Sequence, residues 1–175
     1  STRKESSAAS DVYKRQVLRY PKDNAPAALP FIGPRSLSGL RKLREGKDLN
    51  ILAYGATAEA CLDAAEILLN SSYSSAVYSY ISGKNIHLRD MIGEEFQRRP
   101  LILVTEGVRV QSPSLTLVDE YLHETPELRL KLIAVEDCLA PQGSRKELLE
   151  RESLSAAGIA RKVLDWLPEQ LPESE

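Results

Sequence analysis

The apolar positions of the chain form four short runs separated by stretches with helical spacing. The runs cover residues 49–54, 75–81, 101–105 and 130–135. Short, nearly continuous apolar runs that end at turn residues are typical of strands buried on both faces. The run at 101–105 is the most apolar of the four, so we expect it to lie near the centre of a sheet.

Between the runs, apolar residues recur at steps of three and four, as on one face of a helix. The first such helix carries Cys61, Leu62, Ala65, Leu68 and Leu69, and the last, at 155–167, carries Ile159, Val163, Trp166 and Leu167. Two more are expected around residues 88–96 and 113–122. Strands that alternate with helices require a mostly parallel sheet with right-handed crossovers. With a further short strand at 38–43, we predict an α/β fold: a three-layer sandwich around a mostly parallel sheet of about five strands with one antiparallel edge.

The chain divides into four parts by composition. Residues 1–16 show no apolar periodicity and are expected to be disordered. Their stretch 10–16 resembles translated adapter sequence, so we treat 1–16 as non-native. Residues 17–46 hold four prolines and three glycines and are interpreted as the end of a preceding domain plus a linker. A natural start near Val17 without a methionine indicates truncation. Residues 47–168 then form the main domain, and 169–175 a frayed acidic tail.

Composition narrows the class of protein. Hydrophobic residues make up 42% and charged residues 27%, the balance of a soluble globular protein. A formal charge of −2 gives no general attraction to nucleic acid, and no apolar run approaches the roughly 20 residues that span a bilayer. We therefore expect a cytoplasmic protein without nucleic-acid or membrane partners. Cys61 and Cys138 are expected to be buried free thiols, and two histidines argue against a multi-histidine metal site.

Polar residues at strand ends are the first candidates for chemistry. Gly55 and Thr57 follow a strand and open a helix, a position that can hold anions, but we favour a plain tight turn as the explanation. We expect the Thr57 side chain to cap that helix. Glu106 follows the third strand, where carboxylates can be catalytic in α/β folds, but we favour a structural role in which it caps or pairs with the connection after it.

The remaining candidates have weaker signals. Ser144 and Glu147 fit a capping box at the start of a helix. Asp137 and the turn 141–144 are sufficiently explained by structure. His87 and His123 are titratable, yet no spacing ties them to a nucleophile. Ser112 and Ser114 lack the G-x-S-x-G context of a hydrolase.

Arg19 is the candidate binding residue. It stands before Tyr20 and Pro21, and proline biases its predecessor toward extended backbone. A guanidinium on a rigid extended segment can present its planar fork to a phosphate. From the residues alone, we favour a solvated or paired surface arginine, because that is what a lone arginine usually is.

An ordered series of motifs resembles one enzyme family over residues 17–167. The series is Arg19-Tyr-Pro, Gly46-Lys-Asp-Leu-Asn-Ile-Leu-Ala-Tyr-Gly55, Ala60-Cys-Leu-Asp-Ala-Ala-Glu66, Leu103-Val-Thr-Glu-Gly107, Asp137 with Pro141-Gln-Gly-Ser-Arg-Lys-Glu-Leu148, and Ala157-Gly-Ile-Ala160. It is similar to the C-terminal domain of the transketolase class, and the motifs at 19–21 and 141–144 point within that class to the 1-deoxy-D-xylulose-5-phosphate synthase family.

The resemblance implies a function for a larger enzyme. That enzyme would use thiamine diphosphate and Mg to join pyruvate and glyceraldehyde 3-phosphate in isoprenoid precursor synthesis, and would act as a homodimer. Arg19 matches the arginine that binds the substrate phosphate. The cofactor residues would lie upstream, and no Gly-Asp-Gly occurs here. This fragment is therefore expected to contain no catalytic residue, to bind no cofactor or metal, and to be inactive without the upstream domains.

Two departures from the family pattern leave alternatives open. Tyr80 stands about where the synthases carry a second phosphate-binding arginine, and Lys84 could supply only a shifted point charge. Residues 108–114 lack the glycines of the family's segment. The alternatives are a transketolase-like paralogue with another acceptor, a stand-alone interaction module, a subunit of a split enzyme, and a 2-oxoacid dehydrogenase β subunit, against which the Arg19 motif argues.

Overall fold

The structure is a computed structural model that describes residues 29–30, 40–80, 99–108, 129–136 and 141–167. The strands in these ranges are β1 (Leu40–Arg44), β2 (Leu49–Tyr54), β3 (Ser75–Tyr80), β4 (Leu101–Val108) and β5 (Leu130–Val135). The helices are the 3-10 turn η1 (Gly55–Thr57), α2 (Ala58–Asn70), α5 (Arg145–Arg151) and α6 (Ala156–Trp166). None of the helices in this part of the chain is long and apolar enough to cross a membrane.

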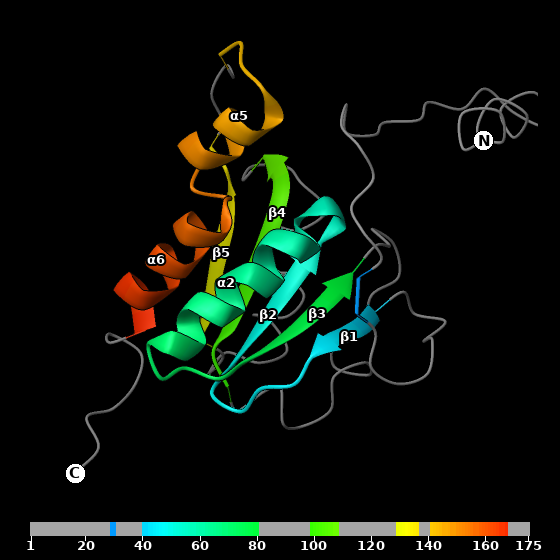
Figure 1. The fold of residues 1–175 in the computed structure, drawn as a ribbon, viewed down its shortest axis with the longest axis vertical. Helices are drawn as coiled ribbons and strands as arrows, with labels where there is room; N and C mark the ends of the chain where they lie inside the picture. Colours follow the sequence, from blue (N-terminus) through cyan, green and yellow to red (C-terminus); the bar gives the residue numbers. More distant parts are fainter. Residues whose placement is uncertain (1–28, 31–39, 81–98, 109–128, 137–140, 168–175) are drawn as a thin grey trace, which may run out of the picture.

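The described strands form one sheet in the order β1-β3-β2-β4-β5. β2 pairs in parallel with β3 and β4, and β4 pairs in parallel with β5, whereas β1 runs antiparallel to β3 (Figure 1). The predicted α/β class, the mostly parallel sheet and its antiparallel edge are therefore confirmed. β4 lies inside the sheet, as expected for the most apolar run, while the central place belongs to β2.

β1 is the short strand predicted at 38–43. Its Leu40 pairs with Tyr80, and its Leu43 is buried in the core. The predicted linker ends at residue 46 and the predicted main domain begins at residue 47. β1 therefore lies in the predicted linker, although it pairs with β3 in the sheet of the main domain. Gly46 lies in the turn after β1 and allows the backbone of this turn to approach β3 closely. A Cβ at this position would lie 2.1 Å from the backbone nitrogen of Ala76.

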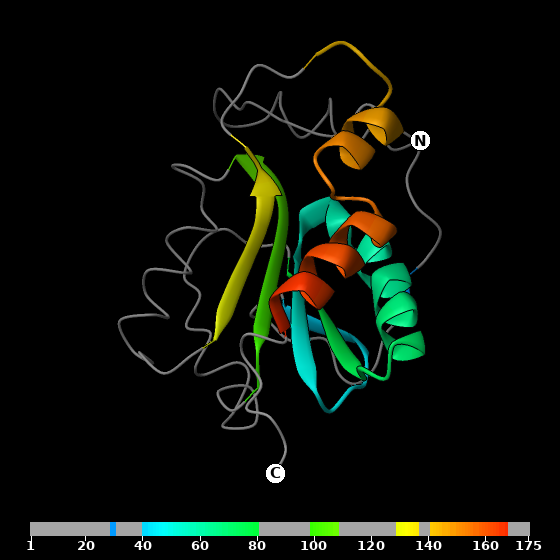
Figure 2. The ribbon, with the colours of Figure 1, turned by 90° about the vertical axis from the view of Figure 1, so that its left-hand side faces the viewer.

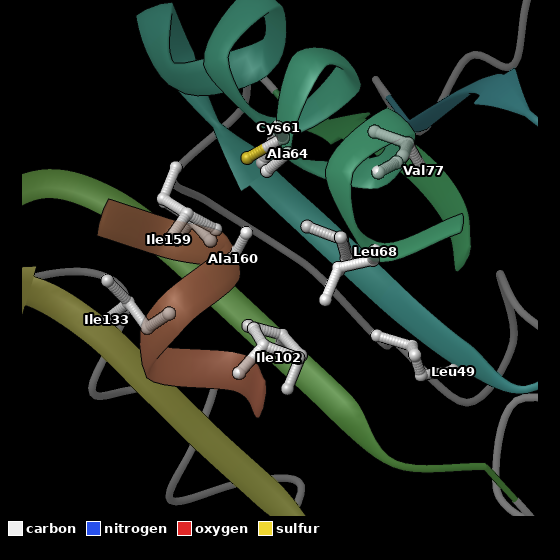
Figure 3. Packing of buried hydrophobic residues seen from close by; sticks show 14 of the residues in the cluster. Leu49, Cys61, Ala64, Leu68, Val77, Ile102, Ile133, Ile159 and Ala160 are labelled. Atoms are coloured by element: carbon white, nitrogen blue, oxygen red, sulfur yellow. The ribbon is translucent and has the colours of Figure 1, made fainter. Parts of the chain in front are cut away.

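α2 and α6 pack side by side on one face of the sheet (Figure 2). Figure 3 shows Cys61, Ala64 and Leu68 of α2 pointing toward Ile159 and Ala160 of α6 above the strands. The helical face was predicted correctly at Cys61, Ala65 and Leu68, but Leu69 is 46% exposed. One residue is a turn of about 100°, so the position after Leu68 points away from the sheet.

The opposite face of the sheet carries a second apolar cluster. Its buried members are Leu40, Leu52, Tyr80, Leu101 and Leu103. Successive strand residues point to opposite faces, so Leu52 belongs to this cluster while Ile51 and Ala53 join the first. Apolar side chains on both faces are typical of a parallel sheet. The helices predicted at 88–96 and 113–122 lie outside the described residues, so the third layer stays a prediction.

Candidate functional site

The order of the strands marks one edge of the sheet as the place to look for a site. The chain crosses from β2 to β3 in one direction and returns past β2 to β4 in the other. Such a reversal opens a crevice at the carboxyl ends of the two diverging strands, where open α/β sheets bind ligands. Here those ends carry Gly55 and Thr57 after β2, and Thr105 to Gly107 near the end of β4.

Thr57 links the carboxyl ends of β2 and β4. Its hydroxyl donates to the carbonyl oxygen of Val104 at 3.2 Å and lies equally close to that of Tyr54. Thr57 occupies the N-cap position of α2, but its side chain makes no capping hydrogen bond. The predicted cap is therefore wrong, because the buried hydroxyl binds the neighbouring strand instead. Gly55 supports the turn with a φ of +69°, a conformation that side chains disfavour.

Glu106 is paired with the start of α5. Its carboxylate accepts a hydrogen bond from the guanidinium of Arg145, the first residue of that helix. β4 continues to Val108, and its pairing with β5 is irregular between Val104 and Val108, so Glu106 sits in a distorted part of the strand. The contact supports the structural role favoured from the sequence, with a partner that sequence reasoning missed.

The capping box before Arg145 is present as predicted. Ser144 accepts from the backbone N–H of Glu147 at 3.3 Å, and the Glu147 carboxylate accepts from the Ser144 backbone N–H at 2.8 Å. Hydrogen bonds from the Ser144 side chain and backbone hold the pKa of Glu147 below its ordinary value. The turn 141–144 and its capping box therefore position Arg145 to contact Glu106. The capping-box motif was the only signal in the sequence for this contact.

Cys61 lies in the first turns of α2, close to Thr57. It is fully buried, with no disulfide partner, as expected from the sequence. Burial raises the pKa of its thiol to about 12, although a hydrogen bond with Thr57 acts in the opposite direction. A thiol that stays protonated at neutral pH is neither a nucleophile nor a metal ligand. Cys138 lies outside the described residues.

Tyr80 ends β3 at the same edge of the sheet. The side chain is fully buried, and its ring centroid lies 5.6 Å from that of Tyr54 on β2, with the rings tilted by 37°. Such a geometry is favourable for aromatic packing. The residue that stands near the family's second arginine is therefore part of the apolar cluster on the second face of the sheet.

The other predicted site residues are not placed. Arg19, Lys84, His87, Ser112, Ser114, His123 and Asp137 all lie outside the described residues. Within the described ranges, no group of three or more histidine, cysteine, aspartate or glutamate side chains could hold a metal ion. At this edge of the sheet, the described residues provide a carboxylate paired with Arg145, a hydroxyl bound to the neighbouring strand and a buried thiol.

Comparison with known proteins decides the family. The family described as "Transketolase, C-terminal domain" matches residues 39–159, which include every described strand. The chain belongs to this family. Two curated relatives of this domain are 1-deoxy-D-xylulose-5-phosphate synthases. The protein from Tropheryma whipplei (strain Twist) is 30% identical over 156 residues, and that from Magnetococcus marinus is 31% identical over 160 residues.

These relatives are much longer than the chain. It covers 23% and 25% of their lengths, while the matches cover 81% and 88% of the chain itself. Solved structures give the same fold. One titled as a split gene transketolase, an inactive beta4 tetramer, superposes with a TM-score of 0.67 at 25% identity. The match covers 77% of this chain and 44% of that chain. The transketolase of Campylobacter jejuni gives 0.54 at 18% identity.

Proposed function

We propose that the chain is the C-terminal part of a thiamine-diphosphate-dependent transferase of the 1-deoxy-D-xylulose-5-phosphate synthase type. Such an enzyme converts pyruvate and glyceraldehyde 3-phosphate to 1-deoxy-D-xylulose 5-phosphate, an isoprenoid precursor. The observation that supports this most is the match of more than four fifths of the chain to synthases at 30% identity or slightly above. The order of motifs from Arg19 to Ala160 agrees with it.

The described residues do not fit the cofactor. A metal-bound diphosphate needs several oxygen ligands around a cation. Near the carboxyl ends of β2 and β4, the carboxylate of Glu106 is already engaged by Arg145, and the described residues hold no acidic cluster. In line with the family resemblance, the proposal assigns thiamine diphosphate and Mg to the upstream domains of the same enzyme and derives no catalytic step from this domain.

In this proposal, the domain acts through its contacts with the rest of the enzyme. Upstream domains and a second copy of the full-length chain are its partners, in a cytoplasmic homodimer. Arg19 is the residue of this chain that touches substrate, because its guanidinium binds the phosphate of glyceraldehyde 3-phosphate.

The test is Arg19→Ala in the full-length enzyme. Loss of one charge-assisted contact to phosphate should raise KM for glyceraldehyde 3-phosphate about tenfold, with KM for pyruvate unchanged. Arg151→Ala, which removes an exposed arginine at the end of α5, is the matched control and should leave both constants unchanged. An unaltered KM for the phosphorylated substrate in Arg19→Ala would remove Arg19 from the site.

A second candidate is a separate subunit of a split transketolase-like enzyme. The observation that favours it is the similarity to the structure titled split gene transketolase, of which the chain covers 44%. The genomic reading frame upstream of Val17 separates the two. A frame that continues through several hundred residues with a Gly-Asp-Gly motif supports the synthase, whereas a start codon near residue 1 supports a subunit or a stand-alone interaction module.

A further inference from the structure

Of the α-helices that the structure describes, α5 is the one that buries none of its residues. Its apolar contribution is Leu149, which packs partly buried against the core. In Figures 1 and 2, α5 lies beyond the ends of α2 and α6, near the tip of β4. It has seven residues, and isolated helices shorter than about 12–15 residues are only marginally stable in water. The helical state of α5 therefore depends on what holds its two ends.

The first turn of α5 is held by contacts that water reaches. The guanidinium of Arg145 donates to the Glu106 carboxylate, and both side chains are partly exposed. Ion pairs open to solvent contribute about 1 kcal/mol at most, and salt weakens them. Glu106 also lies where the pairing of β4 with β5 is irregular, between Val104 and Val108. The hold on this end is therefore weak and electrostatic.

The other end of α5 is built into the core. The carbonyl oxygen of Leu149 accepts from the N–H groups of Leu154 at 2.7 Å and of Ser155 at 3.2 Å. Ser153 ends the helix with a φ of +58°, and Leu154, which follows it, is fully buried. Gly158 of α6 lies so close that a Cβ there would be 2.6 Å from the Cα of Ser153. The chain is therefore fixed from Ser153 onward.

Two side chains of α6 hold the same junction. The Lys162 ammonium donates to the carbonyl oxygen of Glu152 at 3.0 Å, and the Arg161 guanidinium donates to the Ser153 hydroxyl at 3.1 Å. A change in backbone angles is most easily absorbed where a weakly held element meets a firmly held one. In α5 that place is the junction at Ser153.

We propose that α5 opens as a local unit, unfolding from its first turn to the junction at Ser153 while the sheet, α2 and α6 stay folded. The contact between Glu106 and Arg145 is the latch that sets how often it opens. Elements with few buried contacts open at free energies well below that of global unfolding. Each opening separates the Glu106 carboxylate from Arg145, near the edge where the strand order reverses. The inference goes beyond the proposed function, because it holds whichever reaction the full-length enzyme catalyses.

The test is native-state hydrogen exchange of the 175-residue chain, followed by NMR. The amides of α5, among them Leu148, bonded to Ser144, and Glu152, bonded to Leu148, should exchange through one shared opening. Their exchange should be at least about tenfold faster than that of the α2 amides. Raising sodium chloride from about 0.05 to about 0.5 M should speed exchange in α5 and leave α2 unchanged, because salt screens the latch.

Glu106→Gln tests the latch directly. It should speed exchange of the α5 amides about three- to fivefold, leave the α2 amides unchanged and remove the salt dependence of α5. Glu150→Gln makes the same chemical change at an exposed position on α5 and is the matched control. It should not speed exchange.

Other results overturn the proposal. If the α5 amides exchange with the same free energy as those of α2 and the sheet, α5 opens only when the whole domain unfolds. An unaltered rate in Glu106→Gln, or an equal increase in Glu150→Gln, would refute the latch. If Glu106→Gln does not fold, the unmodified chain decides the question, because exchange of α5 that is independent of salt would also refute it.

Discussion

The guanidinium of Arg145 on α5 donates to the carboxylate of Glu106 on β4 and joins two residues 39 positions apart in the chain. α5 buries none of its own residues. Leu149 packs partly buried against the core, and the first turn is fixed by the ion pair to the sheet and the Ser144 capping box. The two side chains are 28% and 31% exposed, so water screens their attraction only in part.

We expect the pair to contribute measurably to stability. Glu106→Gln and Arg145→Ala should each lower the free energy of unfolding by about 1 kcal/mol, and a double-mutant cycle should give a coupling of about 0.5–1 kcal/mol. Urea denaturation of the four proteins measures it, with Lys146→Ala as a control of equal charge change. A coupling of zero would show that the contact does not hold α5 to the sheet.

Gly46 and Gly158 lie directly against backbone atoms of other residues, so neither position should tolerate a side chain. A Cβ on Gly46 would lie 2.1 Å from backbone atoms of Ser75 and Ala76, and one on Gly158 would lie 2.6 Å from the Cα of Ser153. Because backbone cannot move aside cheaply, Gly46→Ala and Gly158→Ala should each cost about 3 kcal/mol or more.

Gly143→Ala is the matched control for the two glycine variants. Its Cβ would meet the Glu147 side chain at 3.4 Å, an ordinary contact, so stability should change by no more than about 0.5 kcal/mol. Thermal denaturation compares all three. Equal losses at the three positions would refute the steric explanation.

Cys61 should make the protein less stable at alkaline pH. Its folded-state pKa is raised by burial to about 12, while an unfolded thiol ionises near pH 8.5. Between these values, the unfolded state has lost a proton that the folded state keeps, so the free energy of unfolding falls as pH rises.

The slope of the free energy of unfolding against pH can be measured in a Cys138→Ser background, in which Cys61 is the one remaining thiol. The urea midpoint is followed from pH 7.5 to about pH 10, with and without Cys61→Ala, so that the window begins below the unfolded thiol's pKa. Removing Cys61 lowers stability at every pH but should reduce the slope. Identical slopes in the two proteins would mean that Cys61 is not the group responsible.

Restoring an arginine at Tyr80 should not restore a phosphate contact. The Tyr80 side chain is fully buried against Tyr54, so Tyr80→Arg would place a cation in an apolar cluster at a cost of about 3 kcal/mol or more. Tyr80→Phe keeps the ring and should cost about 1 kcal/mol. Thermal unfolding compares the stabilities of the two variants. If Tyr80→Arg were as stable as Tyr80→Phe, the position would accept a cation and the prediction would be wrong.

The sequence predicted the features that depend on local pattern. The pattern of the apolar residues identified β2 to β5 and both longer helices. The Ser144 capping box is readable because its two members lie three residues apart. The same pattern wrongly predicted that Leu69 is buried. An apolar helical face is about 100° wide, so the spacing alone does not decide whether a residue at its margin faces the sheet or the solvent.

Contacts between distant segments were not readable. The cap expected from Thr57 is absent because its hydroxyl binds Val104, 47 residues away, and no local rule anticipates that choice. Arg145 was missed as a partner for the same reason, although its place directly after the capping serine was visible. Arg19, the one predicted binding residue, lies outside the described residues and stays a prediction.

The outer edge of β1 has a consequence for solubility. β1 ends the described sheet, and its five residues include Arg41, Lys42 and Arg44, with a break in the pairing register between the last two. If two copies paired through this edge, like charges would lie opposite one another and the irregular backbone would spoil the ladder of hydrogen bonds. Natural sheets use both devices to prevent edge-to-edge aggregation. The strand that completes the sheet thus also disfavours its growth into a larger one.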